Sequence, residues 1–257
     1  MAKLSGCIEM LFATEIESMA ERLVASKEAG LQAVEFWSWR NKNLDDIARA
    51  LGETGLGLTG FIVDPRQAIV DPATHADFLA SVRESVAVAR RLGAESLIVI
   101  TGNEIPGVSR AVQHATVINA LRQAAPMAED AGMQLVLEPL NAVVNHPGYF
   151  LTSTLEGFDM VEEVDSPAVR LLYDLYHSVM MGEQPARVLA SRGHLIGHVH
   201  IADAPGRHEP GTGYIDFPAC LRVITDAGYS GPIGLEFWPT GQTDAAITAT
   251  RLQLKMP

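Results

Sequence analysis

The stretch THADFLASVRESVAVARRLGAESLIVITG, residues 74–102, joins a helical pattern directly to a strand pattern. In 74–93, apolar residues recur three and four positions apart, as on one face of a helix, and the pattern ends at a glycine suited to terminate a helix. The segment 95–102 is a short run of β-branched and other apolar residues, which is typical of a buried strand. The stretch therefore predicts a helix that is followed at once by a strand.

The same arrangement recurs along the whole chain. Short apolar runs that predict strands cover residues 5–12, 31–38, 56–64, 95–102, 133–141, 170–177, 195–203 and 232–239. Helical patterns cover residues 17–30, 43–55, 74–93, 117–132 and 217–231. Asn43 and Asp71 precede two of these patterns and are candidate N-cap residues. Both cysteines, Cys7 and Cys220, lie in apolar surroundings, so we expect two buried thiols and no disulfide framework or CxxC metal site.

This alternation predicts parallel strands joined by helices that cover the sheet. Eight such units predict a closed (β/α)8 TIM barrel, and we expect one domain over residues 1–257 because no linker or low-complexity segment interrupts them. The longest irregular stretch, 203–216, is too short to separate two domains. The structural alternative is a doubly wound open sheet, which is disfavoured because no GxGxxG loop follows the first strand.

The composition restricts the class of partner. A hydrophobic fraction of 47% with 19% charged residues is typical of a soluble globular protein. The formal net charge of -12, without a local cluster of Lys and Arg, disfavours nucleic acid and anionic lipid as partners. No apolar run approaches the roughly 20 residues that span a bilayer, and the N-terminus lacks the features of a signal peptide. We therefore expect a cytoplasmic protein with a small-molecule substrate and no membrane partner; a homo-oligomer is compatible with the sequence.

Four late strands each carry one polar residue near their C-terminal ends, where the active site of such a barrel lies. These residues are Glu138, Asp174, His200 and Glu236. A charged group in an apolar strand is costly to bury unless it is paired or binds a metal. Three carboxylates and one imidazole suit a divalent cation such as Mn²⁺, Mg²⁺ or Co²⁺. The alternative for each residue taken singly is an ion-paired or hydrogen-bonded core position.

Two further histidines lie close to this set. His198 and His200 should point to the same side of a strand, toward the barrel interior, and we assign the residue nearer the mouth, His200, to the metal and His198 to a structural role. His177 follows Asp174 by three residues and is a candidate donor to a substrate oxygen; the alternative is a histidine in a surface loop.

The remaining candidates are expected near the substrate. Arg207 lies in a turn-rich loop and could clasp a carboxylate or a pair of hydroxyls, the alternative being a salt bridge to Glu209. Glu35 and Trp37, at the end of the second predicted strand, would contribute a polar group and a flat wall, whereas Trp39 is better explained by aromatic packing on the rim. Neither cysteine lies in a catalytic motif and no GxSxG elbow occurs, so covalent catalysis has no support.

Together these residues resemble the xylose isomerase-like superfamily of sugar isomerases and epimerases, in particular its hydroxypyruvate isomerase branch. The resemblance covers nearly the whole chain. Its most specific motifs are LEPLN at 137–141, NHPGYFLT at 145–152, DLYH at 174–177, GHVHIADAPGRHEPGTG at 197–213 and LEFWPTG at 235–241.

The resemblance implies a divalent metal held by Glu138, Asp174, His200 and Glu236. It also implies that the two glutamates act as acid and base and that His177 and Arg207 contact substrate. In the ketose 3-epimerases of this superfamily a further glutamate follows the first metal glutamate by six residues, where this chain has Val144, and the loop arginine lies one residue closer to the metal histidine. The hydroxypyruvate branch itself varies at the position of His200.

These departures favour a small keto acid over a ketose. We expect a metal-dependent isomerase that interconverts hydroxypyruvate and tartronate semialdehyde through an enediolate, whose charge the metal would stabilise. A ketose 3-epimerase is the main alternative. An inosose or dehydroshikimate dehydratase, a metal-dependent abasic-site endonuclease and a non-catalytic sugar-binding or regulatory subunit remain as others.

Overall fold

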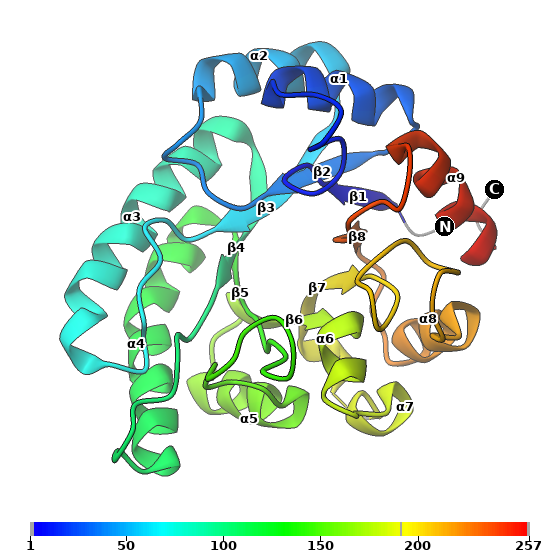
Figure 1. The fold of residues 1–257 in the computed structure, drawn as a ribbon. Coiled ribbons are helices and arrows are strands. Elements are labelled where there is room, and N and C mark those ends of the chain that lie inside the picture. Colours follow the sequence, from blue (N-terminus) through cyan, green and yellow to red (C-terminus); the bar gives the residue numbers. More distant parts are fainter. Residues whose placement is uncertain (1–2, 191, 256–257) are drawn as a thin grey trace.

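A closed barrel of eight parallel strands forms the centre of the computed structural model, which describes residues 3–190 and 192–255. Adjacent strands follow one another in chain order, and β1 hydrogen-bonds with β8. The strands are β1 Leu4–Cys7, β2 Ala33–Phe36, β3 Gly57–Ile62, β4 Ala94–Val99, β5 Gln134–Leu137, β6 Val169–Asp174, β7 Ile196–Ile201 and β8 Ile233–Leu235. The predicted barrel is confirmed, because pairing of the first strand with the last excludes an open sheet (Figure 1).

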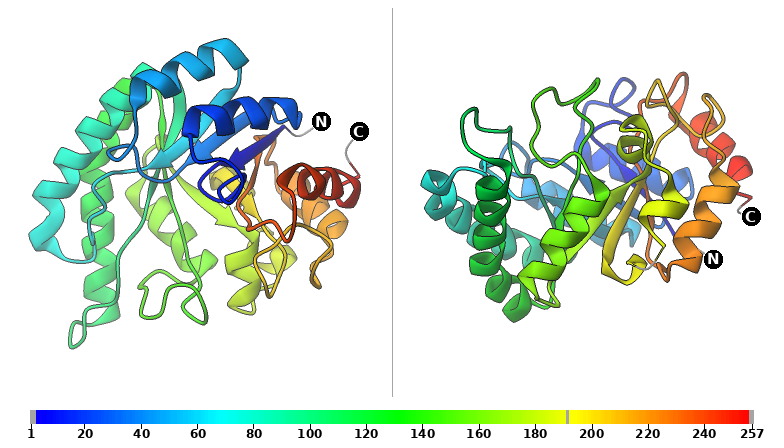
Figure 2. Two further views of the ribbon diagram at one scale, coloured as in Figure 1. Left: turned by 45° about the horizontal axis from the view of Figure 1, so that its top comes forward. Right: turned by 90° about the horizontal axis from the view of Figure 1, so that it is seen from below.

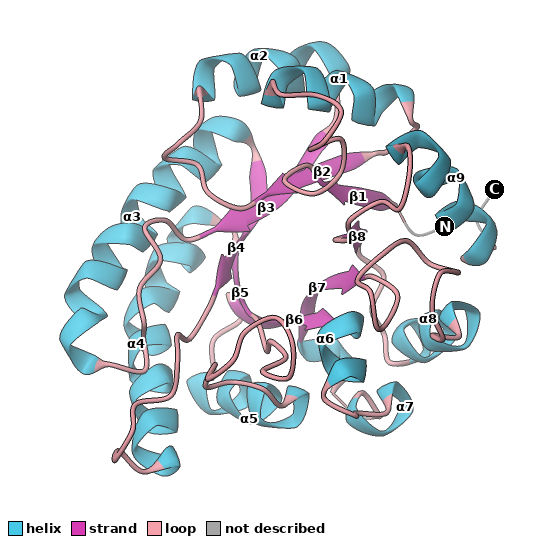
Figure 3. Ribbon diagram, in the orientation of Figure 1, coloured by secondary structure: helices cyan, strands magenta, loops and turns pink. Residues whose placement is uncertain are grey.

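Helices surround the barrel on the outside, as Figures 2 and 3 show. They are α1 Met19–Glu28, α2 Leu44–Thr54, α3 His75–Leu92, α4 Arg110–Ala131, α5 Thr154–Val164, α6 Leu175–Met180, α7 Pro185–Val188, α8 Phe217–Asp226 and α9 Thr243–Gln253. Asn43 caps α2, since its side chain accepts from the backbone N–H groups of the first turn, and Gly55 ends this helix with a φ of 66°. Asp71 instead caps the short 3₁₀ turn Pro72–Thr74, which leads into α3.

Some elements differ from the sequence-based expectations. Helix α9 was not anticipated, because its buried face consists largely of threonine and alanine, which give little hydrophobic periodicity. The run 5–12 predicted a longer strand than β1, since buried apolar residues continue into the following turn. Cys7 is buried as expected, whereas Cys220 is only half-buried on α8, so the expectation of two buried thiols was wrong for Cys220.

The apolar residues form two clusters. The larger cluster lies between the strands and the helices. The smaller cluster faces the barrel interior, because its members alternate along the strands with residues of the larger cluster. Its members, Ile62, Ile98, Val136 and Leu172, come from β3 to β6. The buried residues of β1, β2 and β7 make the other part of the interior polar, through Ser5, Glu35, His198 and His200.

Within the described residues, no helix is both long enough and apolar enough to cross a lipid bilayer.

Candidate metal and active site

The four residues that the sequence analysis assigned to a metal lie together at the C-terminal ends of β5 to β8. Glu138 and Glu236 directly follow β5 and β8, Asp174 ends β6, and His200 lies one residue before the end of β7. Nδ1 of His200 is 3.2 Å from Oε2 of Glu236 and 3.7 Å from Oε1 of Glu138. It is 4.0 Å from Oδ2 of Asp174. All four side chains are buried, so three carboxylates surround one imidazole nitrogen.

This donor set fits a divalent cation. Nδ1 of His200 is buried and has no hydrogen-bond partner within the described residues. Burial by itself lowers the pKa of His200, but Glu35 and Glu236 outweigh it and raise this pKa well above the usual range. The surroundings thus favour positive charge at this point, and oxygen donors with one imidazole are ligands that Mn²⁺, Mg²⁺ and Co²⁺ accept. Without a cation, mutual repulsion among the carboxylates would be left uncompensated.

His177 is a second imidazole at the same point. The ligand atoms of Glu138, Asp174, His177 and Glu236 all lie within 4.8 Å of one another. His177 is buried on α6, so the alternative of a surface-loop histidine was wrong. The backbone N–H of Asn141 donates to Nδ1 of His177 (3.1 Å), so the neutral ring carries its proton on Nε2. Since burial lowers the pKa of His177 to about 4, this residue presents a donor where His200 presents a lone pair.

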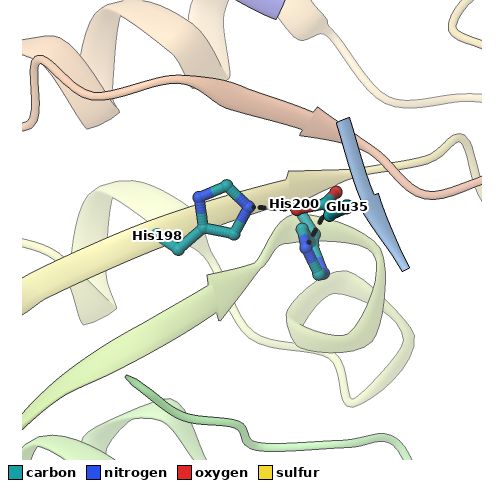
Figure 4. Close-up of side chains that lie close together, drawn as sticks. All are labelled: Glu35, His198 and His200. Carbon is teal, nitrogen blue, oxygen red and sulfur yellow. Dashed lines mark hydrogen bonds and ion pairs between the residues drawn. The ribbon is translucent and has the colours of Figure 1, made fainter. Parts of the chain in front are cut away.

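Glu35 lies on the opposite edge of the His200 ring (Figure 4). Oε1 of Glu35 is 3.2 Å from Nε2 of His200, and Nε2 of His198 donates to Oε2 of Glu35 (2.7 Å). Burial alone would raise the pKa of Glu35, but the two histidines outweigh it and hold this pKa below the usual range. His198 and His200 share one face of β7, as predicted, and their rings pack edge to face. Glu35 does not line the cavity where a substrate would bind.

That cavity opens at the metal-ligand cluster and has a volume of about 300 Å³. Its lining combines acids, donors and an apolar wall: Trp37, Ile62, Arg66, Ile100, Gly102, Asn103, Glu138, Leu140, His146, Tyr149, His177, Arg207 and Glu236. Trp39 lies elsewhere, where its indole donates to Oγ of Ser85 (3.0 Å). Sequence reasoning did not select Arg66, Asn103 or His146. The only available signal was the position of each residue in a loop that follows a predicted strand.

Glu236 is held by two donors. Nη2 of Arg207 donates to Oε2 of Glu236 (2.7 Å), and Nε1 of Trp37 donates to Oε1 (2.9 Å). Burial would raise the pKa of Glu236, but Arg207 and His200 outweigh it and keep this pKa well below the usual range. The expected alternative of a pair between Arg207 and Glu209 was wrong, because Glu209 instead accepts from the backbone N–H of Thr240 (3.0 Å).

Glu138 has the opposite tendency. Burial, aided by the negative charges of Glu236 and Asp174, raises its pKa to about 7 despite a hydrogen bond with His200. The two glutamates at one cluster thus have pKa values that are pushed apart, an arrangement that separates acid and base roles in enzymes. A bound divalent cation would lower the pKa of each carboxylate that it contacts.

The loop that carries Arg207 is built around one carboxylate. The side chain of Asp203 accepts from the backbone N–H groups of Gly211 (2.8 Å), Gly213 (2.9 Å) and Ile215 (3.1 Å). The backbone N–H of Trp238 donates to the carbonyl of Arg207 (3.0 Å), which ties this loop to the segment after β8. Asp203 thereby fixes the loop from which Arg207 reaches Glu236.

Comparisons with known proteins agree with this geometry. Residues 23–254 match the family model described as xylose isomerase-like TIM barrel. The chain is 28% identical to hydroxypyruvate isomerase of Escherichia coli (strain K12), over 96% of this chain and 97% of that protein. It is also 28% identical to 2-oxo-tetronate isomerase of Pectobacterium atrosepticum, over 96% of each chain. A crystal structure of AP endonuclease, family 2, from Brucella melitensis superposes with a TM-score of 0.90, at 29% identity, over 97% of this chain and 98% of that one. The chain therefore belongs to the xylose isomerase-like TIM barrel family.

Proposed function

We propose that this protein is a divalent-metal-dependent isomerase of a short 2-keto acid, which interconverts hydroxypyruvate and tartronate semialdehyde. The observation that carries the proposal is the convergence of three buried carboxylates on Nδ1 of His200 at the edge of a cavity. The relatives named above, which are isomerases of keto acids by their names, support the same reaction class.

The metal ligands in this proposal are Glu138, Asp174, His200 and Glu236. When bound, the cation would act as a Lewis acid that stabilises the negative charge developing on the substrate oxygens during proton transfer. Mn²⁺, Mg²⁺ and Co²⁺ are the candidates because the donor set is mainly oxygen.

Glu138 is the residue that we assign to proton transfer at carbon, with Glu236 as the second member of the acid–base pair. A pKa of about 7 allows Glu138 to take up and release a proton near neutral pH, whereas Glu236 stays ionised. In the forward reaction a proton leaves C3 of hydroxypyruvate and one is added at C2, while a proton leaves O3 and one is gained at O2. The enediolate between these steps bears the charge, and no atoms are gained or lost.

The neighbouring side chains hold the reacting groups and exclude water. His177 is neutral and can donate from Nε2 to a substrate oxygen. Arg207 and Trp37 fix the orientation of Glu236 through their hydrogen bonds. Ile62, Ile100 and Leu140 form an apolar wall, which strengthens electrostatic interactions inside the cavity. A cavity of about 300 Å³ is at the lower end for small-molecule sites, so a short substrate fits it best.

The test is a turnover assay of protein stripped with a chelator and then loaded with one metal. We expect no turnover of hydroxypyruvate without metal, recovery with Mn²⁺, Mg²⁺ or Co²⁺, and little turnover of D-fructose or D-tagatose. The variant Glu138→Gln should lower kcat by about 10²–10⁴ and abolish exchange of the C3 proton with D₂O at saturating metal. Turnover of ketoses but not of keto acids would replace this proposal with a ketose 3-epimerase, and metal-independent turnover would refute the metal role.

The proposal includes a cytoplasmic location and a small-molecule substrate. It includes no nucleic acid, because the net charge of -12 repels phosphates. An assay of abasic DNA under the same metal conditions should show no cleavage, and cleavage would contradict this part of the proposal.

A further inference from the structure

We propose that Arg66 forms an anion subsite that binds the carboxylate of the substrate and thereby selects keto acids over neutral ketoses. This inference rests on the proposed function and specifies which wall of the cavity receives the charged end of the substrate. Arg66 follows β3 and is exposed, and it lines the cavity together with Gly102 and Asn103.

The segment that carries Arg66 is packed firmly on the end of β4. The backbone N–H of Val70 donates to the carbonyl of Thr101 (3.1 Å). Gly102 has a φ of 89°, and a Cβ at this position would lie 2.6 Å from Cβ of Ala68. A side chain at residue 102 would therefore force this segment away. The close approach places Arg66 at the cavity in a defined position.

The guanidinium of Arg66 is available for a ligand. Within residues 3–190 and 192–255, its side chain makes no hydrogen bond or ion pair. The nearby acid Asp64 accepts instead from the backbone N–H of Arg40 (3.1 Å). The other arginine of the cavity, Arg207, is paired with Glu236 at 2.7 Å. Of these two arginines, only Arg66 can form an ion pair with a substrate without breaking an existing one.

Charges on the cavity walls are arranged to orient a keto acid. Three carboxylates and their cation occupy one wall, whereas Arg66, Asn103 and His146 line the cavity without any acid among them. Burial and the charges of Arg207 and Arg66 lower the pKa of His146, so this ring is neutral and adds no competing charge. A keto acid can direct its carbonyl and hydroxyl oxygens toward the cation and its carboxylate toward Arg66. A neutral ketose has no group that gains from Arg66.

The test measures binding separately from turnover. We would titrate the Mn²⁺-loaded wild type and the variant Arg66→Gln with D-glycerate, an unreactive carboxylate, and with glyceramide, its neutral amide. We expect the Kd of D-glycerate to rise about tenfold in Arg66→Gln, because a charge-assisted contact is lost at an exposed site, and the Kd of glyceramide to stay unchanged. The matched control Arg83→Gln removes an exposed arginine from α3, outside the cavity lining, and should leave both constants unchanged.

Steady-state kinetics give a second measurement. Arg66→Gln should raise KM for hydroxypyruvate about tenfold with little change in kcat, and the preference of the wild type for D-glycerate over glyceramide should weaken as salt is added. An unchanged Kd for D-glycerate in Arg66→Gln, an equal loss for both compounds, or no binding of D-glycerate by the wild type would overturn the subsite. If D-glycerate binding depends on Arg66 but hydroxypyruvate is not turned over, the subsite stands and the proposed function fails. If turnover is normal and insensitive to Arg66, the reverse holds.

Discussion

Glu35 shows how a buried carboxylate can prepare a metal ligand without lining the cavity. Its Oε2 accepts from His198 (2.7 Å) and from Oγ1 of Thr59 (3.0 Å), which leaves Oε1 facing Nε2 of His200. A carboxylate at this edge favours the proton on Nε2 and leaves Nδ1 free to face the other three acids. Such contacts orient the ligand and raise its basicity.

The variant Glu35→Gln tests this role. The amide keeps the volume of the side chain but not the charge, so we expect the Kd for Mn²⁺ to rise about 10- to 100-fold, as measured by calorimetry. Glu84→Gln, an exposed carboxylate on α3, serves as the control. An unchanged Mn²⁺ affinity in Glu35→Gln, with the fold intact by circular dichroism, would show that Glu35 does not position His200.

His177 should make the metal-free protein sensitive to acid. Its pKa is about 4 in the fold and 6.5 as the ordinary value, so the unfolded chain binds the proton more tightly. The stabilising effect of a neutral His177 is complete above pH 6.5 and is lost as the pH falls toward 4, by up to about 3 kcal/mol.

Urea unfolding at several pH values in the presence of a chelator measures this effect. The free energy of unfolding should fall less steeply between pH 6.5 and 4 in His177→Gln than in the wild type. The control His194→Gln changes an exposed histidine and should keep the wild-type slope. Equal slopes for the wild type and His177→Gln would mean that other groups cause the acid sensitivity.

At the scale of elements, each strand of the later half of the barrel delivers one ligand, and the loop after β7 delivers a cation to the same point. This division follows from the barrel, since the C-terminal ends of all strands meet at one rim. The loop has no strand to support it and depends on Asp203, whose carboxylate gathers three backbone N–H groups. The position of Arg207 is therefore a property of the whole loop.

Asp203→Ala should disturb both the loop and the site. Removal of the carboxylate leaves backbone donors without their partner, so we expect the free energy of unfolding to fall by roughly 2–4 kcal/mol and kcat to fall as Arg207 loses its position. Urea unfolding and steady-state kinetics measure the two effects, with Asp226→Ala at the exposed end of α8 as the control. Loss of stability without loss of kcat would show that Arg207 does not depend on this loop.

At the scale of the molecule, a cation would connect β5, β6, β7 and β8 through one ligand from each. Binding to the folded state alone stabilises a protein by about 2.7 kcal/mol at a ligand concentration one hundred times the Kd. We therefore expect Mn²⁺ to raise Tm and a chelator to lower it. In Asp174→Asn, which lacks one ligand charge, the shift at the same Mn²⁺ concentration should be smaller. A Tm that does not respond to Mn²⁺ or chelator would contradict the predicted metal site.

The sequence by itself determined the architecture and the rim positions of Glu138, Asp174, His200 and Glu236. Strand and helix periodicities are local properties, and the alternation of eight strands with helices leaves few ways to cover the sheet. A polar residue at the end of an apolar strand is equally visible in the sequence, because it interrupts a local pattern.

Only the tertiary structure decided which groups face one another. Glu35 and His198 are 163 residues apart in sequence and meet because the barrel closes. The pairing of Arg207 with Glu236, the burial of His177 and the free guanidinium of Arg66 likewise depend on how loops from distant strands pack around one cavity. Local periodicity carries no information on such contacts, since they are fixed by the closure of the sheet and by packing between segments far apart in the chain.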